Sequence, residues 1–198
     1  MRTTKREVPI AIVPLIDPRT NASPPRWLLE FLSKNVPKAI EPSTVQIGPS
    51  LVVPKSAFDE SRGQFVSEEV LMALRRVTVT HPNGRVLGVM AADAYARDLN
   101  FVFGQAELGG NYAVIYLTRL TPGVNSRGLA VRALKEAVHE LGHTLGLKHC
   151  DNRACVMSFS NTIADTDAKD WRFCSSCREK LLAFISRLPP VGADGSWS

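Results

Sequence analysis

The residues most able to do chemistry lie between His139 and His149, a stretch that reads HELGHTLGLKH. On a helix, His139 and His143 are four residues apart and lie one above the other on the same face. Two imidazoles so placed can bind one zinc ion, and Glu140, next to the first, can act on a zinc-bound water. The spacing therefore predicts a metal site with a carboxylate beside it.

The third histidine of this stretch completes the predicted ligand set. Gly146 ends the helix, because glycine readily takes the left-handed conformation that turns a chain out of its last helical turn. That turn lets His149 approach the metal from another direction. Three neutral imidazoles leave the fourth tetrahedral position for water, which is typical of a catalytic zinc site. The alternative is a polar helix whose histidines face solvent, but three of the four histidines in the chain fall here, which favours a metal.

Length and composition indicate a soluble globular protein. The chain has 198 residues, 44% of them hydrophobic and 22% charged, which suits one domain with room for a small appendage. It lacks a run of about 18 apolar residues that could span a membrane. The first residues have no apolar segment and no small-residue cleavage site, so we expect no secretory signal and a cytoplasmic location.

The charge distribution argues against nucleic-acid binding. The net charge is +5, but the basic residues are scattered and form no patch with interleaved aromatic residues. We therefore expect neither nucleic acid nor membrane as a partner, and we expect a monomer.

Hydrophobic patterns predict alternating strands and helices. The predicted strands are residues 8–16, 44–47, 85–91, 101–106 and 112–120, and the predicted helices are 26–35, 68–77, 128–145 and 176–188. Residues 51–64 give no clear pattern and are expected to form a loop, and Ser67 is the expected N-cap of the second helix. The last two strands flank a Gly-Gly-Asn turn and should form a hairpin. The predicted fold class is α/β, a mixed twisted sheet with one antiparallel edge strand and packed helices.

The predicted helix 128–145 can pack on the sheet and still present its histidines to a cleft. His139 and His143 lie about 100° around the helix from an apolar stripe. The stripe consists of Val131, Leu134, Val138, Leu141 and Leu145.

All four cysteines follow this helix. Cys174 and Cys177 have the spacing of a metal-binding knuckle, and Cys150 and Cys155 can supply two further ligands. Four thiolates make a closed tetrahedral site, so we interpret the set as a structural zinc site. Disulfides are disfavoured in a reducing cytosol, and a thioredoxin-like redox pair lacks its strand context. A nucleic-acid-binding zinc ribbon would need outward-facing basic and aromatic residues around Cys174.

The segment after the helix needs such a site. Residues 151–170 are polar and poor in large apolar groups, so they cannot order themselves by burial alone. A structural zinc site contributes on the order of 10 kcal/mol. We therefore predict an upper part, residues 1–149, and a small zinc-stapled helical part, residues 150–198, with a loose tail at 189–198. Met157 is expected to form an apolar floor beneath the histidines.

These residues together resemble a known family. The HExxHxxGxxH run followed by Met157 is similar to the metzincin zinc peptidases. Cys150 directly after the third histidine, then Cys155-Val156-Met157 and Cys174-Ser-Ser-Cys177, resembles the archaemetzincin branch. The resemblance covers residues 139–177, about a fifth of the chain.

The resemblance implies peptidase chemistry with two zinc ions, one catalytic and one structural. Residue by residue, it makes His139, His143 and His149 the ligands of the catalytic zinc, Glu140 the general base and Met157 the Met-turn residue. It makes Cys150, Cys155, Cys174 and Cys177 the ligands of the structural zinc. Some metzincins have a tyrosine two residues after the methionine, and here that position is Phe159.

The functional hypothesis is a zinc-dependent metallopeptidase that hydrolyses a peptide or small protein substrate. Glu140 would take a proton from the zinc-activated water and later pass it to the leaving amine. The substrate would lie along the predicted edge strand 101–106. The alternative is a zinc-binding scaffold or peptide-binding protein with little turnover. An aminopeptidase would need a carboxylate for the free amine, and Asp93 and Glu107 are the candidates that the sequence offers.

Overall fold

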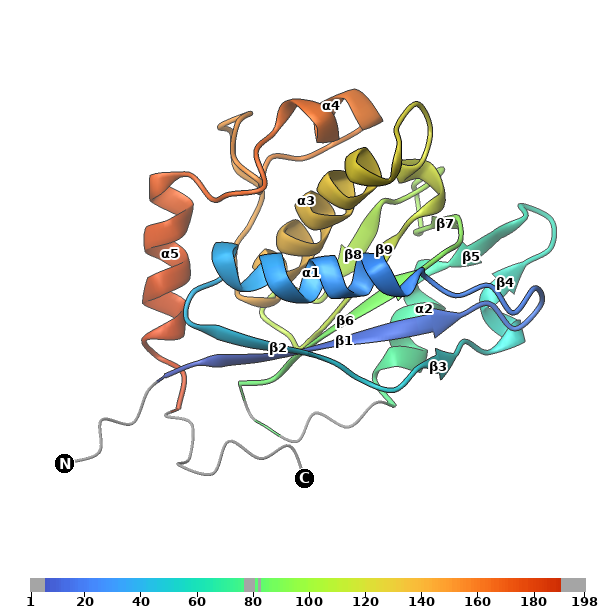
Figure 1. Cartoon of the computed structure of the whole chain (residues 1–198), viewed down its shortest axis with the longest axis horizontal. Helices are drawn as coiled ribbons and strands as arrows, with labels where there is room; N and C mark the ends of the chain where they lie inside the picture. Colours follow the sequence, from blue (N-terminus) through green and yellow to red (C-terminus); the bar gives the residue numbers. More distant parts are fainter. Residues whose placement is uncertain (1–5, 77–80, 82, 190–198) are drawn as a thin grey trace.

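A mixed six-stranded sheet is the frame of the molecule (Figure 1). The computed structural model describes residues 6–76, 81 and 83–189. The sheet has the order β2-β1-β6-β9-β8, and β3 pairs with the end of β1. Its strands are β1 (Val8–Ile16), β2 (Ser43–Ile47), β3 (Leu51–Val52), β6 (Arg85–Met90), β8 (Gly104–Ala106) and β9 (Tyr112–Tyr116).

One strand of this sheet runs against the others. The pairs β1–β2, β1–β6 and β6–β9 are parallel, whereas β8 is antiparallel to β9. The hairpin pairs Gly104 with Ile115 and Ala106 with Ala113. The predicted α/β class with one antiparallel edge strand is therefore confirmed. Both hairpin strands are shorter than predicted, because residues 101–103 precede β8 and residues 117–120 follow β9. Three of the latter form a 3₁₀ helix, η2 (Thr118–Leu120).

Helices cover the two faces of the sheet. They are α1 (Arg26–Ala39), α2 (Ser67–Leu74), α3 (Ser126–Thr144), α4 (Ile163–Ala168) and α5 (Ser175–Ile185). In Figure 1, α1 and α3 lie over the same face of the sheet, and α5, in red, stands at one end of α3. The main core lies between this face of the sheet and the helices, and it contains side chains of β1, α1, α3 and α5. A second core lies between the opposite face of the sheet and α2.

The alternation of side chains along β1 explains why this strand is apolar throughout. Ile12 belongs to the core under α1 and α3, and its neighbour Val13 belongs to the core under α2. Their side chains are 0% and 1% exposed. A parallel strand covered on both faces buries both sets of side chains, so it reads as a continuous apolar run.

Three local expectations were wrong. The stretch 51–64 is not a loop, because it contains β3, the 3₁₀ helix η1 (Lys55–Ala57), β4 (Phe58–Asp59) and the start of β5 (Gln64–Val66). The strands β4 and β5 form a second small sheet with β7 (Ala94–Tyr95). Strands of two or three residues are too short to show a period of two, so no hydrophobic pattern indicates them.

The other two errors concern one helix start and one missed helix. Ser67 is not the N-cap of α2 but its first residue, and its hydroxyl oxygen accepts a hydrogen bond from the Tyr116 hydroxyl, at 2.9 Å. The end predicted at Val77 lies outside the described residues. Helix α4 was not predicted at all. It begins with a capping box in which Thr162 and Asp165 bond to each other's main-chain N–H groups.

Substituting Gly88, in the centre of β6, would test how tightly side chains pack around this strand. A Cβ atom at this position would lie 2.8 Å from Leu15 Cδ1 and 3.1 Å from Leu74 Cδ2. Overpacking of a closed core costs about 1–3 kcal/mol, so Gly88→Ala should lower the free energy of unfolding by that amount in urea titrations. Gly48→Ala is the control, because its Cβ would meet no atom closer than 3.8 Å. Equal stability of both variants would contradict this account.

Candidate metal centres

Helix α3 carries the predicted histidines, and both of its ends are well defined. At its start, the Asn125 side chain accepts a hydrogen bond from Gly128 N. At its end, Gly146 has a φ of +80°, and the N–H groups of Gly146 and Leu147 donate to the carbonyls of His143 and Gly142. This left-handed exit is the turn that the sequence predicted, and it directs His149 back along the helix.

Two main-chain carbonyls orient the helical histidines. His139 Nδ1 lies 2.7 Å from the carbonyl oxygen of Val156, and His143 Nδ1 lies 2.7 Å from that of Leu147. A carbonyl oxygen can only accept, so Nδ1 must carry the proton on both rings. Each Nε2 therefore presents a lone pair, and the two Nε2 atoms are 3.1 Å apart.

The third histidine completes a triad in space. Nitrogen atoms of His139, His143 and His149 all lie within 4.8 Å of one another. The His149 ring stacks against the His139 ring, with centroids 5.4 Å apart. The His143 ring also contacts it, and outside the triad its aromatic neighbour is Phe159, whose ring centroid is 4.9 Å away.

The surroundings keep these imidazoles neutral. Burial lowers the pKa of His139 well below its usual 6.5, and the nearby Lys169 ammonium lowers it further. Burial also lowers the pKa of His143 and of His149, with Lys169 again contributing. The neutral ring is the form that binds a metal ion.

This donor set fits a zinc ion. Nitrogen ligands at about 2.05 Å from a tetrahedral zinc are about 3.3 Å apart, close to the 3.1 Å between the two helical Nε2 atoms. Two acceptor lone pairs facing each other at this distance repel unless a cation lies between them. Both rings also have their second nitrogen bonded, the usual arrangement for metal-binding histidines.

Glu140 is held beside the triad by the edge strand. Its side chain is buried, and a Cβ atom at Gly104 of β8 would lie 2.6 Å from Glu140 Cγ and 2.7 Å from Glu140 Oε1. The carboxylate thus occupies the space that glycine leaves free. Burial raises the pKa of Glu140 well above its usual value, the neighbouring Glu136 adds to this, and Lys169 opposes it. A bound dication would favour the ionised form.

A cleft of about 780 Å³ contains the triad and Glu140. One wall is formed by residues 98–106, which end in β8, and the facing wall by Phe159, Ser160 and Asn161. Neither carboxylate suggested for binding a free amine reaches it. Asp93 is paired with Arg119 at 2.7 Å and Glu107 with Arg75; both side chains are absent from the cleft lining.

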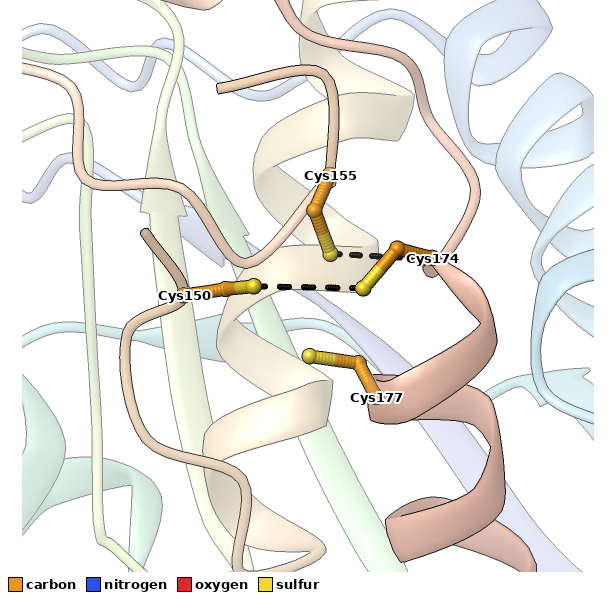
Figure 2. A group of neighbouring side chains, drawn as sticks. All are labelled: Cys150, Cys155, Cys174 and Cys177. Carbon is orange, nitrogen blue, oxygen red and sulfur yellow. Dashed lines mark hydrogen bonds between the residues drawn. The ribbon is translucent and has the colours of Figure 1, made fainter. Parts of the chain in front are cut away.

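The four cysteines form a second cluster next to the first (Figure 2). Cys150 follows His149 directly, Cys155 precedes the Met157 turn, and Cys174 and Cys177 lie at the start of α5. Figure 2 shows the four thiols pointing toward a common centre. Their sulfur atoms lie within 4.8 Å of one another, and none is in a disulfide.

The geometry of this cluster suits a metal better than a disulfide. Cys150 Sγ and Cys174 Sγ are 3.8 Å apart, whereas a disulfide requires about 2.05 Å. Sulfur ligands at about 2.3 Å from a tetrahedral zinc are separated by about 3.8 Å. The main-chain N–H of Cys177 lowers the pKa of Cys174 to about 7, which favours the thiolate, whereas burial raises the pKa of Cys155 and of Cys177. A bound cation would favour the thiolate form of all four.

Met157 connects the two clusters. Its side chain is 0% exposed, and a Cβ atom on Gly142 would lie 2.5 Å from Met157 Sδ, so helix α3 and this turn approach each other through glycine. The Met157 carbonyl accepts a hydrogen bond from Cys150 N, at 3.0 Å. An apolar side chain therefore packs against α3 one residue before His143.

Sequence reasoning missed two charged residues of this region. Lys169 and Glu136 form an ion pair of 3.1 Å, with side chains only 1% and 4% exposed, and Glu136 lines the cleft. Glu136 precedes Glu140 by one helical turn, which was a visible signal. Lys169 gave none, because it lies in a polar segment that suggested only solvent exposure.

A triad of histidines on a helix and an adjoining turn, with a glutamate beside an edge strand, is the arrangement of a zinc metallopeptidase. Residues 38–183 match the model of Peptidase family M54. The archaemetzincin of Methanocaldococcus jannaschii is 48% identical over 159 residues, which are 78% of this chain and 85% of that protein.

Solved structures agree with these sequence matches. The chain superposes on the archaemetzincin of Methanopyrus kandleri with a TM-score of 0.82 and 33% identity, covering 94% of this chain and 100% of that one. The archaemetzincin of Archaeoglobus fulgidus, in complex with malonate, gives a TM-score of 0.74 and 39% identity, covering 87% and 99%. The chain therefore belongs to the archaemetzincin family of metallopeptidases, which are hydrolases.

No helix in residues 6–76 and 83–189 combines the length and the apolar character needed to cross a membrane.

Metal content tests whether two separate centres exist. Protein loaded with zinc and freed of excess should contain two ions per chain. Cys177→Ser should retain one ion and lose thermal stability, because α5 shares the main core. His143→Asn should also retain one ion but with a smaller loss of stability. Inductively coupled plasma mass spectrometry and thermal unfolding give both values, and two ions in either variant would contradict the assignment.

Proposed function

We propose that this protein hydrolyses peptide bonds at the triad, with His139, His143 and His149 as the ligands of one zinc ion. The observation that carries the proposal is the pair of Nδ1–carbonyl hydrogen bonds, which leaves Nε2 lone pairs converging on one point. Bound there, zinc would polarise the substrate carbonyl and lower the pKa of a bound water toward 7.

Within this proposal Glu140 is the general base. Its carboxylate lies in the same cleft as the three imidazoles and is one residue from the first of them. It takes the proton from the attacking water and passes it to the leaving amine. Gly104 leaves the space that this carboxylate occupies, because the Cβ atom of any larger residue would overlap it.

We propose that the substrate lies along β8. This strand is the last in the order of the sheet and, among the described strands, pairs with β9 alone, so its outer main-chain groups are available to an extended peptide. Gly104 and Ala106, two residues apart on β8 and therefore on the same face of the strand, border the cleft that contains the triad. A peptide added here would pass directly in front of Glu140.

A second zinc ion, bound by Cys150, Cys155, Cys174 and Cys177, has a structural role in this proposal. A four-cysteine site leaves no open position for a substrate. It joins the turn after α3 to the first turn of α5 and so supports the division that we propose between residues 1–149 and 150–198. The partner is a peptide or small protein.

Replacing the general base tests the chemistry. Glu140→Gln keeps the shape of the side chain but removes its proton-accepting carboxylate, so hydrolysis should fall by about 10²–10⁴-fold. A library of fluorogenic peptides, assayed with and without chelator, gives the rates, and metal analysis should find the zinc content unchanged. Cleavage by Glu140→Gln at the parental rate would refute the mechanism. Parental protein that cleaves no peptide of the library would favour a binding protein instead.

Gly104 offers an independent test of how Glu140 is placed. In Gly104→Ala the new Cβ would lie 2.6 Å from Glu140 Cγ and 2.8 Å from the Val114 carbonyl, so the carboxylate must move. A displacement of about 1 Å can cost about 10²-fold in rate. We expect a loss of that order in kcat with zinc content retained, and no loss in Gly48→Ala. Unchanged kcat in Gly104→Ala would show that Glu140 does not depend on this contact.

A further inference from the structure

The three histidines of the triad are not held equally. His139 and His143 each donate from Nδ1 to a main-chain carbonyl. His149, by contrast, is exposed, and in the described part of the chain its ring makes ring contacts and no hydrogen bond. A metal ligand without a second hydrogen bond needs another group to fix its orientation.

Phe159 is the aromatic residue that contacts His149 from outside the triad. The two ring centroids are 4.9 Å apart and the rings are inclined by 57°. Phe159 is 50% exposed, so burial in the core does not fix its position. Its place against His149 depends on how the main chain around it is held.

A local turn holds that main chain, since Ser158 N donates to the carbonyl oxygen of Cys155 at 2.9 Å, and a buried lysine contacts it from the other side. Lys169 Nζ donates to the carbonyl oxygen of Ser158, the residue before Phe159, at 3.4 Å. The same Nζ lies 3.1 Å from Glu136 Oε1, and the hydroxyl of Thr166 also donates to Glu136 Oε1, at 3.1 Å. Glu136 in turn lies on α3, the helix that carries His139 and Glu140.

A buried ion pair is a weak source of stability, because removing both charges from water costs about as much as their attraction returns. Its value lies in geometry: breaking it leaves a buried charge without a partner, so the groups stay where they are. Here the fixed groups are helix α3 and the turn at Ser158, which form two sides of the same cleft.

We propose that the buried Lys169–Glu136 pair positions His149, by holding the main chain at Ser158 so that Phe159 stays packed against the His149 ring. Phe159 then limits the orientation of the third imidazole by ring contact, whereas the carbonyl groups fix both orientation and tautomer of the other two. The inference rests on the proposed role of His149 as a metal ligand. Lys169, Glu136 and Phe159 are positioning residues in this scheme.

The same two helices are joined by a second buried lysine, which provides a matched control. Lys135 Nζ donates to the carbonyls of Thr166 and Asp167, at 2.9 and 2.8 Å. Both lysines link α3 to the α4 region, Lys169 through the Glu136 carboxylate and Lys135 through these two carbonyls. Among the described residues, only Lys169 donates a hydrogen bond to Ser158. A purely structural role for Lys169 predicts that both lysines matter alike.

The test measures the affinity of the histidine centre for zinc alone. Protein with its cysteine centre filled is titrated with zinc against a competing chelator. Lys169→Met should bind this ion about tenfold or more weakly, as is typical for the loss of a supporting group near a metal ligand. Lys135→Met should stay within about twofold of the parent, and Lys169→Arg should recover part of the affinity.

Phe159→Ala keeps the proposal testable if Lys169→Met does not fold, because an exposed ring contributes little to folding. It should weaken zinc binding by a similar factor. In the double variant Lys169→Met/Phe159→Ala the losses should not multiply, since both changes release the same ring.

Parental affinity in Phe159→Ala, or equal losses in Lys169→Met and Lys135→Met, would overturn the inference while leaving the metal centre intact. A parental protein that binds no zinc at the histidines would overturn the proposed metal centre, and the inference with it. His149→Asn, which removes the ligand itself, separates these cases.

Discussion

The carbonyl groups of Val156 and Leu147 impose the constraint on which the site depends. The two carbonyls accept hydrogen bonds from Nδ1 of His139 and of His143, which lie one helical turn apart on α3. These hydrogen bonds fix the tautomer of both rings and direct both Nε2 atoms toward one point. The resulting Nε2–Nε2 distance of 3.1 Å is unfavourable for two acceptors and favourable around a cation. Because Val156 lies in the segment after α3, the site forms only when that segment is folded back against the helix.

The segment after α3 packs back against this helix through polar contacts as well as apolar ones. Arg132, Lys135 and Glu136 form one polar side of α3 and are almost completely buried against the α4 region. Arg132 pairs with Asp167, at 2.6 Å. Charged groups that are buried and paired are costly to displace, so this side of α3 fixes the position of the facing cleft wall more strictly than apolar packing would.

The cysteine cluster fixes the position of α5 relative to the turn after α3. Cys150 directly follows the third histidine, and Cys177 belongs to α5, whose Leu181 and Ile185 enter the main core. The stretch between them includes the short helix α4 and buries a few apolar side chains, among them Val156 and Met157. A few fixed points, namely the thiol cluster, Met157 and the buried lysines, therefore determine its path.

The sequence by itself determined the features that depend on neighbours along the chain. The spacing of His139, His143 and His149, the exit at Gly146 and the pairs of cysteines all follow from local geometry, and long apolar runs such as 8–16 are recognisable because their period persists. These features were enough for the fold class and for the family resemblance that the comparisons confirm.

Only the tertiary structure decided which distant groups meet. Lys169 and Glu136 are separated by more than thirty residues, and nothing near Lys169 indicates that it is buried. Ser67 was predicted to be a helix cap, yet its hydroxyl oxygen accepts a hydrogen bond from the Tyr116 hydroxyl on β9. The role of Gly104 is likewise invisible until Glu140 is seen to fill the space beside it. Such contacts arise from the packing of whole elements, which no local pattern specifies.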